Sequence, residues 1–144
     1  MIEQDTIKLL RECDAGIKMG ITSIYEVLGY VKNEELRQEL TTYKHKHEKL
    51  KEEMMLLLDQ YHDDGKEPNP MAKGMSWLKT NVKLVMDESD ETIADLMVDG
   101  ANMGVKSLTR YLHEYQAADE KSKDLAKRLI KLEEKMAEDM RKFL

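Results

Sequence analysis

This chain of 144 residues has little of several things from which folds are commonly built. It contains one cysteine, Cys13, two prolines, both between positions 68 and 70, and only 6% aromatic residues. A single cysteine can form neither an intrachain disulfide nor a cysteine-based metal site, so a reducing, cytoplasmic location is the default expectation. Few aromatic residues and few β-branched runs leave little material for strands. The composition therefore predicts an all-α protein.

Long hydrophobic runs and excess positive charge are also missing. The longest apolar stretch, residues 54–58, is far shorter than the roughly 20 residues that span a bilayer, and the first residues lack the pattern of a secretory signal. The net charge is −6, so the overall field repels phosphate backbones and anionic lipid. The basic run at 44–51 is interrupted by Glu48. We therefore expect neither nucleic acid nor a membrane as a partner.

The chain does contain a repeat of itself. The segment Gly16-Ile17-Lys18-Met19-Gly20-Ile21-Thr22-Ser23-Ile24 returns 84 residues later as Gly100-Ala101-Asn102-Met103-Gly104-Val105-Lys106-Ser107-Leu108. Both glycines, the methionine, the serine and the β-branched position are kept. Each copy opens a long amphipathic segment that a second one follows, so the repeating unit is predicted to be a helical hairpin.

Apolar residues at steps of three and four predict four long helices, over residues 6–32, 34–63, 89–115 and 120–142. Asn33 and Ser89 are expected to be N-caps, and Gly65 is expected to follow the end of the second helix. The short turn at Asn33 makes the first two helices antiparallel. Residues 71–86 show helical spacing as well and predict a short helix between the hairpins.

The whole chain is predicted to be a single domain, residues 1–144. Its first hairpin covers residues 5–64, its crossover with the short helix covers 65–88, and its second hairpin covers 89–144. Two hairpins joined by one long crossover match the plan of ferritin-like bundles.

A family resemblance rests on four stretches of the sequence. These are Leu9-Leu10-Arg11-Glu12-Cys13-Asp14-Ala15-Gly16, the turn Tyr30-Val31-Lys32-Asn33-Glu34-Glu35-Leu36, the Gly-Met-Ser-Trp region at 74–77, and residues 111–144. Together they resemble an uncharacterised bacterial branch of the ferritin-like four-helix-bundle superfamily. The resemblance covers nearly the whole chain and implies a ferritin-like bundle built from two duplicated hairpins.

The chemistry usual for ferritin-like carboxylate proteins is not expected here. Such proteins hold two metals with a Glu from each of two helices and a Glu-x-x-His from each of the other two. The sequence contains no Glu-x-x-His, and Val98 stands where the repeat would match Asp14. We therefore predict no di-iron centre, no cofactor and no enzymatic activity.

Asp14 and His47 are the only ionisable groups in the apolar seams of the first hairpin. Pairing the helices around Asn33 separates them by about seven residues along the axis, roughly 10 Å, which is too far for direct contact. Glu133, which matches His47 in the repeat at an offset of 86, is a candidate partner for His47. A structural polar pair is the simplest interpretation. The alternatives are a metal or proton-transfer site that uses Asp14, His47 and Glu133, and a histidine that faces solvent. Cys13, beside a carboxylate and near the apolar face, is expected to be unreactive.

Gly16, Gly20, Gly100 and Gly104 lie four apart on one face of their helices. Each glycine costs a helix about 0.5–1 kcal/mol against alanine, so a compensating contact is expected. Close helix packing is the first explanation. A ligand that approaches the backbone is the second.

The sequence favours a non-enzymatic ferritin-like bundle that acts as a structural, regulatory or partner-binding module, and we expect it to form a homodimer. The alternative is a degenerate protein of the same fold that binds a metal or a small ligand. No motif identifies a protein partner or a pathway.

Overall fold

The computed structural model describes residues 2–66 and 89–144, and within these ranges all regular structure is helical. Four long helices and one 3-10 turn make up this part of the chain: α1 (Ile2–Leu28), α2 (Glu34–Asp59), α5 (Asp90–Glu114), α6 (Glu120–Met140) and η1 (Arg141–Phe143). The predicted all-α class is therefore confirmed. The predicted helix at 71–86 lies outside the described residues.

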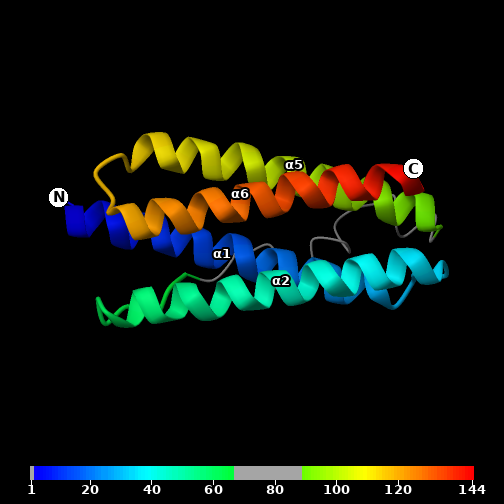
Figure 1. Cartoon of the computed structure of the whole chain (residues 1–144), viewed down its shortest axis with the longest axis horizontal. Coiled ribbons are helices and arrows are strands. Elements are labelled where there is room, and N and C mark those ends of the chain that lie inside the picture. The colour runs from blue at the N-terminus through cyan, green and yellow to red at the C-terminus, as the bar shows by residue number, and fades with distance from the viewer. Residues whose placement is uncertain (1, 67–88) are drawn as a thin grey trace.

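The four helices lie side by side as a bundle (Figure 1). α1 is antiparallel to α2, and α5 is antiparallel to α6, with the closest packing inside each of these hairpins. α2 ends at the opposite end of the bundle from the point where α5 begins (Figure 1). The two helix ends that the connection between the hairpins joins therefore lie at opposite ends of the bundle.

The predicted N-caps are confirmed, and the predicted helix ends need correction. The side chains of Asn33 and Ser89 accept hydrogen bonds from the backbone N–H three residues ahead, and Asp119 caps α6 in the same way. α2 ends at Asp59, four residues earlier than predicted, so Gly65 does not cap it. Gly65 does adopt a positive φ of 86°, which glycine tolerates well, within the connection that follows. α1 also begins and ends earlier than predicted, at Ile2 and Leu28.

Residues near the start of each hairpin form hydrogen bonds with the turn of the other hairpin. The Asp90 carboxylate, at the start of α5, accepts hydrogen bonds from the backbone N–H groups of Lys32 and Asn33, at 2.9 and 3.0 Å. At the opposite end, the hydroxyl of Thr6 in α1 accepts a 2.8 Å hydrogen bond from the backbone N–H of Asp119. Thr6 and Asp90 are 84 residues apart, the spacing of the sequence repeat. Both hairpin turns are thus fixed by equivalent positions.

Two apolar clusters fill the bundle. The cluster near the α1–α2 turn is built around Ile24, Leu40, Ile93, Leu96 and Met140. The cluster near the α5–α6 turn is built around Leu9, Ile17, Met54, Leu125 and Leu129. Burial of such side chains is worth about 1.5–3 kcal/mol each, and the two clusters together hold the four helices in place.

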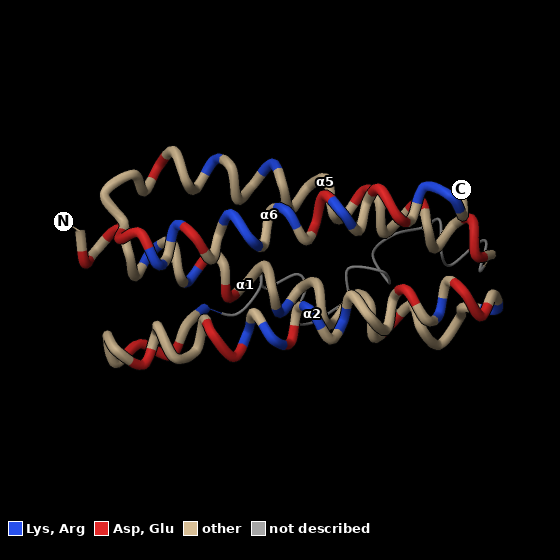
Figure 2. Tube along the Cα trace, viewed as in Figure 1, with Lys and Arg blue, Asp and Glu red and all other residues tan. Residues whose placement is uncertain are grey.

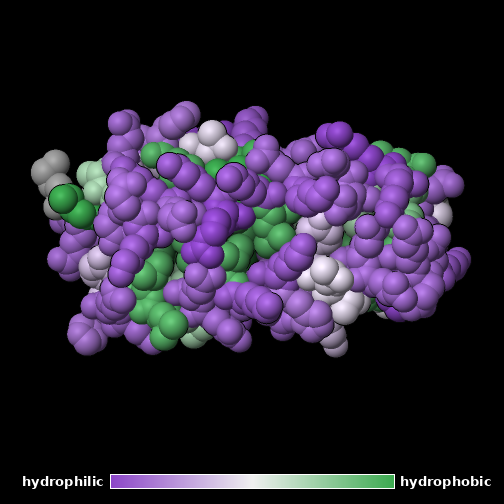
Figure 3. Space-filling model, in the orientation of Figure 1, coloured by the Kyte–Doolittle hydropathy of each residue, from purple (hydrophilic) through white to green (hydrophobic). Residues whose placement is uncertain are grey.

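Each of the four helices carries both positively and negatively charged residues along its length (Figure 2). On the face shown in Figure 3, hydrophilic residues frame hydrophobic ones that show through between α6 and α2. None of the described helices is long and apolar enough to cross a bilayer.

Candidate functional site

A polar layer separates the two apolar clusters at the middle of the bundle. Each helix contributes one residue to it: Gly20 from α1, His47 from α2, Gly104 from α5 and Glu133 from α6. Each of these residues lies between members of the two clusters along its own helix, as Gly20 does between Ile17 and Ile24. The four helices therefore place one pair of polar side chains at the centre of the fold.

His47 and Glu133 form this pair, as the sequence predicted. The His47 side chain is completely buried, and the Glu133 side chain is 9% exposed. His47 Nε2 lies 2.5 Å from Glu133 Oε1, and His47 Nδ1 lies 2.7 Å from the carbonyl oxygen of Tyr43. Burial lowers the pKa of His47, but the hydrogen bond and charge of Glu133, with the hydrogen bond to Tyr43, outweigh burial and raise the pKa above its ordinary value.

The two glycines of the layer face this pair. A Cβ added at Gly20 would lie 2.8 Å from Cδ2 and 2.9 Å from Nε2 of His47, which is too close for a real contact. A Cβ added at Gly104 would lie 3.7 Å from Cγ of Glu133, an ordinary van der Waals distance. The closest approach at these glycines is therefore to side chains from α2 and α6, whereas the sequence suggested close packing of helix backbones.

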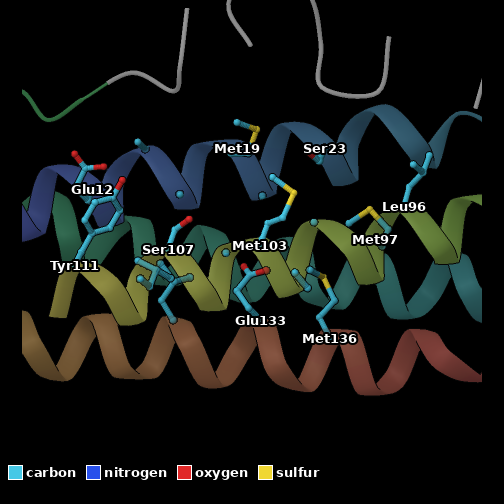
Figure 4. A pocket seen from close by; sticks show the side chains of 18 of the residues that line it. Glu12, Met19, Ser23, Leu96, Met97, Met103, Ser107, Tyr111, Glu133 and Met136 are labelled. Atoms are coloured by element: carbon cyan, nitrogen blue, oxygen red, sulfur yellow. The ribbon is translucent and has the colours of Figure 1, made fainter. Parts of the chain in front are cut away.

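A cavity of about 470 Å³ lies between α1 and α5, with α6 as its floor (Figure 4). All four glycines of the repeat line it, together with residues that the 84-residue offset also relates. These further pairs are Met19 with Met103 and Ser23 with Ser107. Equivalent residues of the repeat thus form opposite walls of one cavity.

The floor and one end of the cavity carry its charged groups. Glu133 lies at the floor near Met103, while Glu12 and Tyr111 lie together at one end (Figure 4). Lys66 Nζ is 2.6 Å from Glu12 Oε1, so these two charges neutralise each other. The rest of the lining is mostly apolar, with Leu96, Met97, Leu108 and Met136 among its residues.

Asp14 is buried but takes no part in the polar layer. One of its oxygens accepts a 2.8 Å hydrogen bond from the backbone N–H of Lys66 and lies 2.9 Å from Lys18 Nζ. Asp14 therefore anchors the chain that follows α2. The structure brings His47 and Glu133 together and gives Asp14 a separate set of partners.

Cys13 lies in the apolar cluster near the α5–α6 turn and is completely buried. Burial, with smaller contributions from the charges of Glu12 and Asp14, raises its pKa to about 12. Because only the thiolate is a good nucleophile, the folded protein keeps this thiol unreactive.

Within residues 2–66 and 89–144, no group of three or more His, Cys, Asp or Glu side chains could hold a metal ion. The sequence predicted a ligand at the glycines of the repeat only as the second explanation, and it did not identify Met19, Met103 or Tyr111 as site residues. The repeated Gly-x-x-Met-Gly-x-x-Ser pattern was the available signal, since it places small residues along two facing walls.

No protein family, curated protein or solved structure matches this chain. The residues of the cavity and of the polar layer are therefore the basis for a functional proposal.

Proposed function

We propose that this chain is a non-enzymatic helical-bundle protein that binds an apolar small molecule in the cavity between α1 and α5. The cavity carries the proposal. Its volume of about 470 Å³ falls in the range of small-molecule sites, about 300–1,000 Å³. Its lining combines many apolar side chains with a few polar groups, which is typical of such sites.

The glycines of the repeat support a cavity that is kept open. Each costs its helix about 0.5–1 kcal/mol against alanine, and a contact across the bundle explains only the glycine facing His47. At Gly16 the nearest atom to an added Cβ is Leu129 Cδ2, at 4.0 Å, so an alanine would fit there. A binding site gives a reason for glycine at this position, because larger side chains would fill the space that the ligand occupies.

The methionines support the same proposal. Met19, Met97, Met103 and Met136 line the cavity. Methionine side chains are unbranched and polarizable, so they adapt to the shape of an apolar guest. Binding is favoured over catalysis because the lining supplies apolar contacts and a single buried acid with a histidine behind it.

The metal-binding alternative has less support. Glu133 Oε1 is already in contact with His47, and Asp14 is in contact with Lys18 and Lys66. A metal at either place would have to displace a cation or a proton that the protein itself supplies. We therefore propose a ligand other than a metal ion.

We also propose that the bundle is ferritin-like in its connectivity. What supports this is the pair of antiparallel hairpins, together with the positions of the end of α2 and the start of α5 at opposite ends of the bundle (Figure 1). The expected homodimer stays a prediction. Met55 and Leu56, adjacent on α2 and 50% and 67% exposed, are a place to look for its contact, and light scattering of the purified chain measures its mass in solution.

Binding of a neutral fluorescent probe tests the proposed function. N-phenyl-1-naphthylamine is apolar and becomes bright when it leaves water, and we expect saturable binding of one probe per chain. Gly16→Leu should fill the cavity and weaken probe binding at least about tenfold, because the probe would lose at least one large apolar contact. Gly29→Leu is the matched control, since Gly29 is exposed in the turn after α1.

Two results would contradict the proposal. One is probe binding that never saturates. The other is an equal effect of Gly16→Leu and Gly29→Leu on a saturable signal, which would place the probe elsewhere.

A further inference from the structure

Resting on this proposed function, we infer that the ligand carries an uncharged hydroxyl group and donates its hydrogen bond to Oε2 of Glu133. The way in which the buried His47–Glu133 pair holds its proton makes this site favour neutral alcohols over anionic and cationic molecules of the same size.

Nδ1 of His47 carries a proton. It lies 2.7 Å from the carbonyl oxygen of Tyr43. A carbonyl oxygen can only accept a hydrogen bond, so Nδ1 must carry a proton and donate it. This leaves Nε2 as the nitrogen that faces Glu133.

Nε2 of His47 and Oε1 of Glu133 are 2.5 Å apart. One proton lies between these atoms. If it is on Nε2, an imidazolium donates to a carboxylate, and if it is on Oε1, a carboxylic acid donates to a neutral imidazole. The net charge of the pair is zero in both arrangements.

Oε2, the other oxygen of Glu133, is the atom that a ligand can reach. The Glu133 side chain is about nine-tenths buried and lines the cavity (Figure 4), and no side chain or backbone N–H of the described residues donates to Oε2. With the proton on either side of the short contact, Oε2 has free lone pairs and no proton. It is therefore an acceptor open to the cavity, and a ligand that displaces water from Oε2 without donating a hydrogen bond would leave it unpaired, at a cost of about 1–3 kcal/mol.

Charged ligands are disfavoured at this site. An anion would bring a second negative group to an acceptor oxygen in apolar surroundings. A cation would enter beside a pair of zero net charge, so its burial would not be compensated unless the pair released its proton. The charges at the end of the cavity offer nothing further, because Lys66 and Glu12 pair with each other at 2.6 Å. A neutral hydroxyl satisfies Oε2 without either penalty.

Competition against N-phenyl-1-naphthylamine with a matched set of molecules tests this inference. 1-Heptanol and its isomer 1-methoxyhexane contain the same atoms, but only the alcohol can donate a hydrogen bond. We expect 1-heptanol to bind at least about tenfold more tightly than the ether, as one hydrogen bond to a strong acceptor predicts. Heptanoate and heptylammonium should bind more weakly than 1-heptanol at pH 7.

Variants of Glu133 place the effect on this residue. Glu133→Gln keeps an acceptor towards the cavity, because its amide N–H group donates to Nε2 of a neutral His47 and leaves the amide oxygen free, so the preference for the alcohol should persist. Combining His47→Leu with Glu133→Leu removes the acceptor and leaves no buried polar partner behind. This double variant should bind alcohol and ether within about twofold of each other. Ser107→Ala, which removes a hydroxyl from the cavity wall, is the control and should keep the preference.

The outcomes separate the two proposals. If the probe does not bind saturably, the proposed function is wrong. If the probe binds but the ether or heptanoate competes as well as the alcohol, the cavity binds ligands and the inference about the hydroxyl is wrong. The wild-type comparison decides this even if the double variant fails to fold.

Discussion

The two hairpins of the bundle carry the same pattern and differ at the residues that matter most. In the first hairpin Gly20 lies against the ring of His47, and in the second Gly104 lies against the side chain of Glu133. These positions correspond in the sequence repeat, so a base and an acid occupy equivalent places and meet at the centre. If both places held histidine or both held glutamate, two like groups would compete for one proton. The difference between the halves is what makes a neutral buried pair possible.

A second difference lies at Asp14, whose counterpart in the other hairpin is Val98. Asp14 holds the backbone of Lys66 after α2. Val98 instead packs against the apolar cluster near the α1–α2 turn. The polar residue in the seam of α1 thus stands where a backbone group requires a hydrogen-bond partner.

The largest effect is expected from breaking the central pair on one side only. His47→Leu leaves the Glu133 carboxylate buried without its partner and should lower the free energy of unfolding by about 3–5 kcal/mol. Adding Glu133→Leu should recover part of this loss, because both polar groups are then gone. Urea unfolding of the two single variants and the double variant measures the coupling. A coupling energy below about 0.5 kcal/mol would mean that the two side chains do not interact.

Alanine substitutions at the two central glycines test whether the two hairpins are packed differently. Gly20→Ala should cost about 1–3 kcal/mol, because the new Cβ overlaps a ring that is held on both sides. Gly104→Ala should be neutral or stabilising by up to about 1 kcal/mol, because its Cβ has room and alanine favours the helix. Equilibrium unfolding in urea gives both values. Equal effects of the two substitutions would show that the halves are packed alike.

The smallest expected effect is a dependence of stability on pH. The pKa of His47 is raised in the folded state, so the folded protein holds a proton that the unfolded chain releases near pH 6.5. Stability from this group is therefore fully present below about pH 6.5 and is lost as the pH rises through the folded pKa. Unfolding curves between pH 6 and pH 9 should show this loss in the wild type and not in the double Leu variant. A wild-type stability that rises over this range relative to the double variant would contradict the prediction.

Much of the fold could be predicted because the apolar periodicity is strong and the caps are clear. Asn33 and Ser89 were identified by residue type and position, and His47 was matched with Glu133 through the repeat. The end of α2 was predicted wrongly because Gly65 was read as a helix cap, whereas the chain leaves the helix at Gln60 and uses Gly65 in the connection.

The cavity could not be predicted, for a physical reason. A Gly-x-x-x-Gly pattern shows that something approaches the helix, but the sequence does not tell whether that is a backbone, a side chain or a ligand. Gly20 accommodates a side chain, and Gly16 faces open space lined by Leu129 at 4.0 Å. This distinction depends on how far α1 and α5 stand apart, which follows from the packing of all four helices together.

The state of the His47 ring is the most direct test of the central claim, that equivalent positions of the two hairpins meet in a neutral pair sharing one proton. Nitrogen NMR of protein labelled at histidine, with the ring of His47 assigned by its loss in a variant, reports both ring nitrogens. We predict a protonated Nδ1 throughout the range from pH 5 to pH 8, and an Nε2 signal that changes only above the ordinary pKa of histidine. A neutral ring at pH 7 with its proton on Nε2 and a bare Nδ1 would contradict the account.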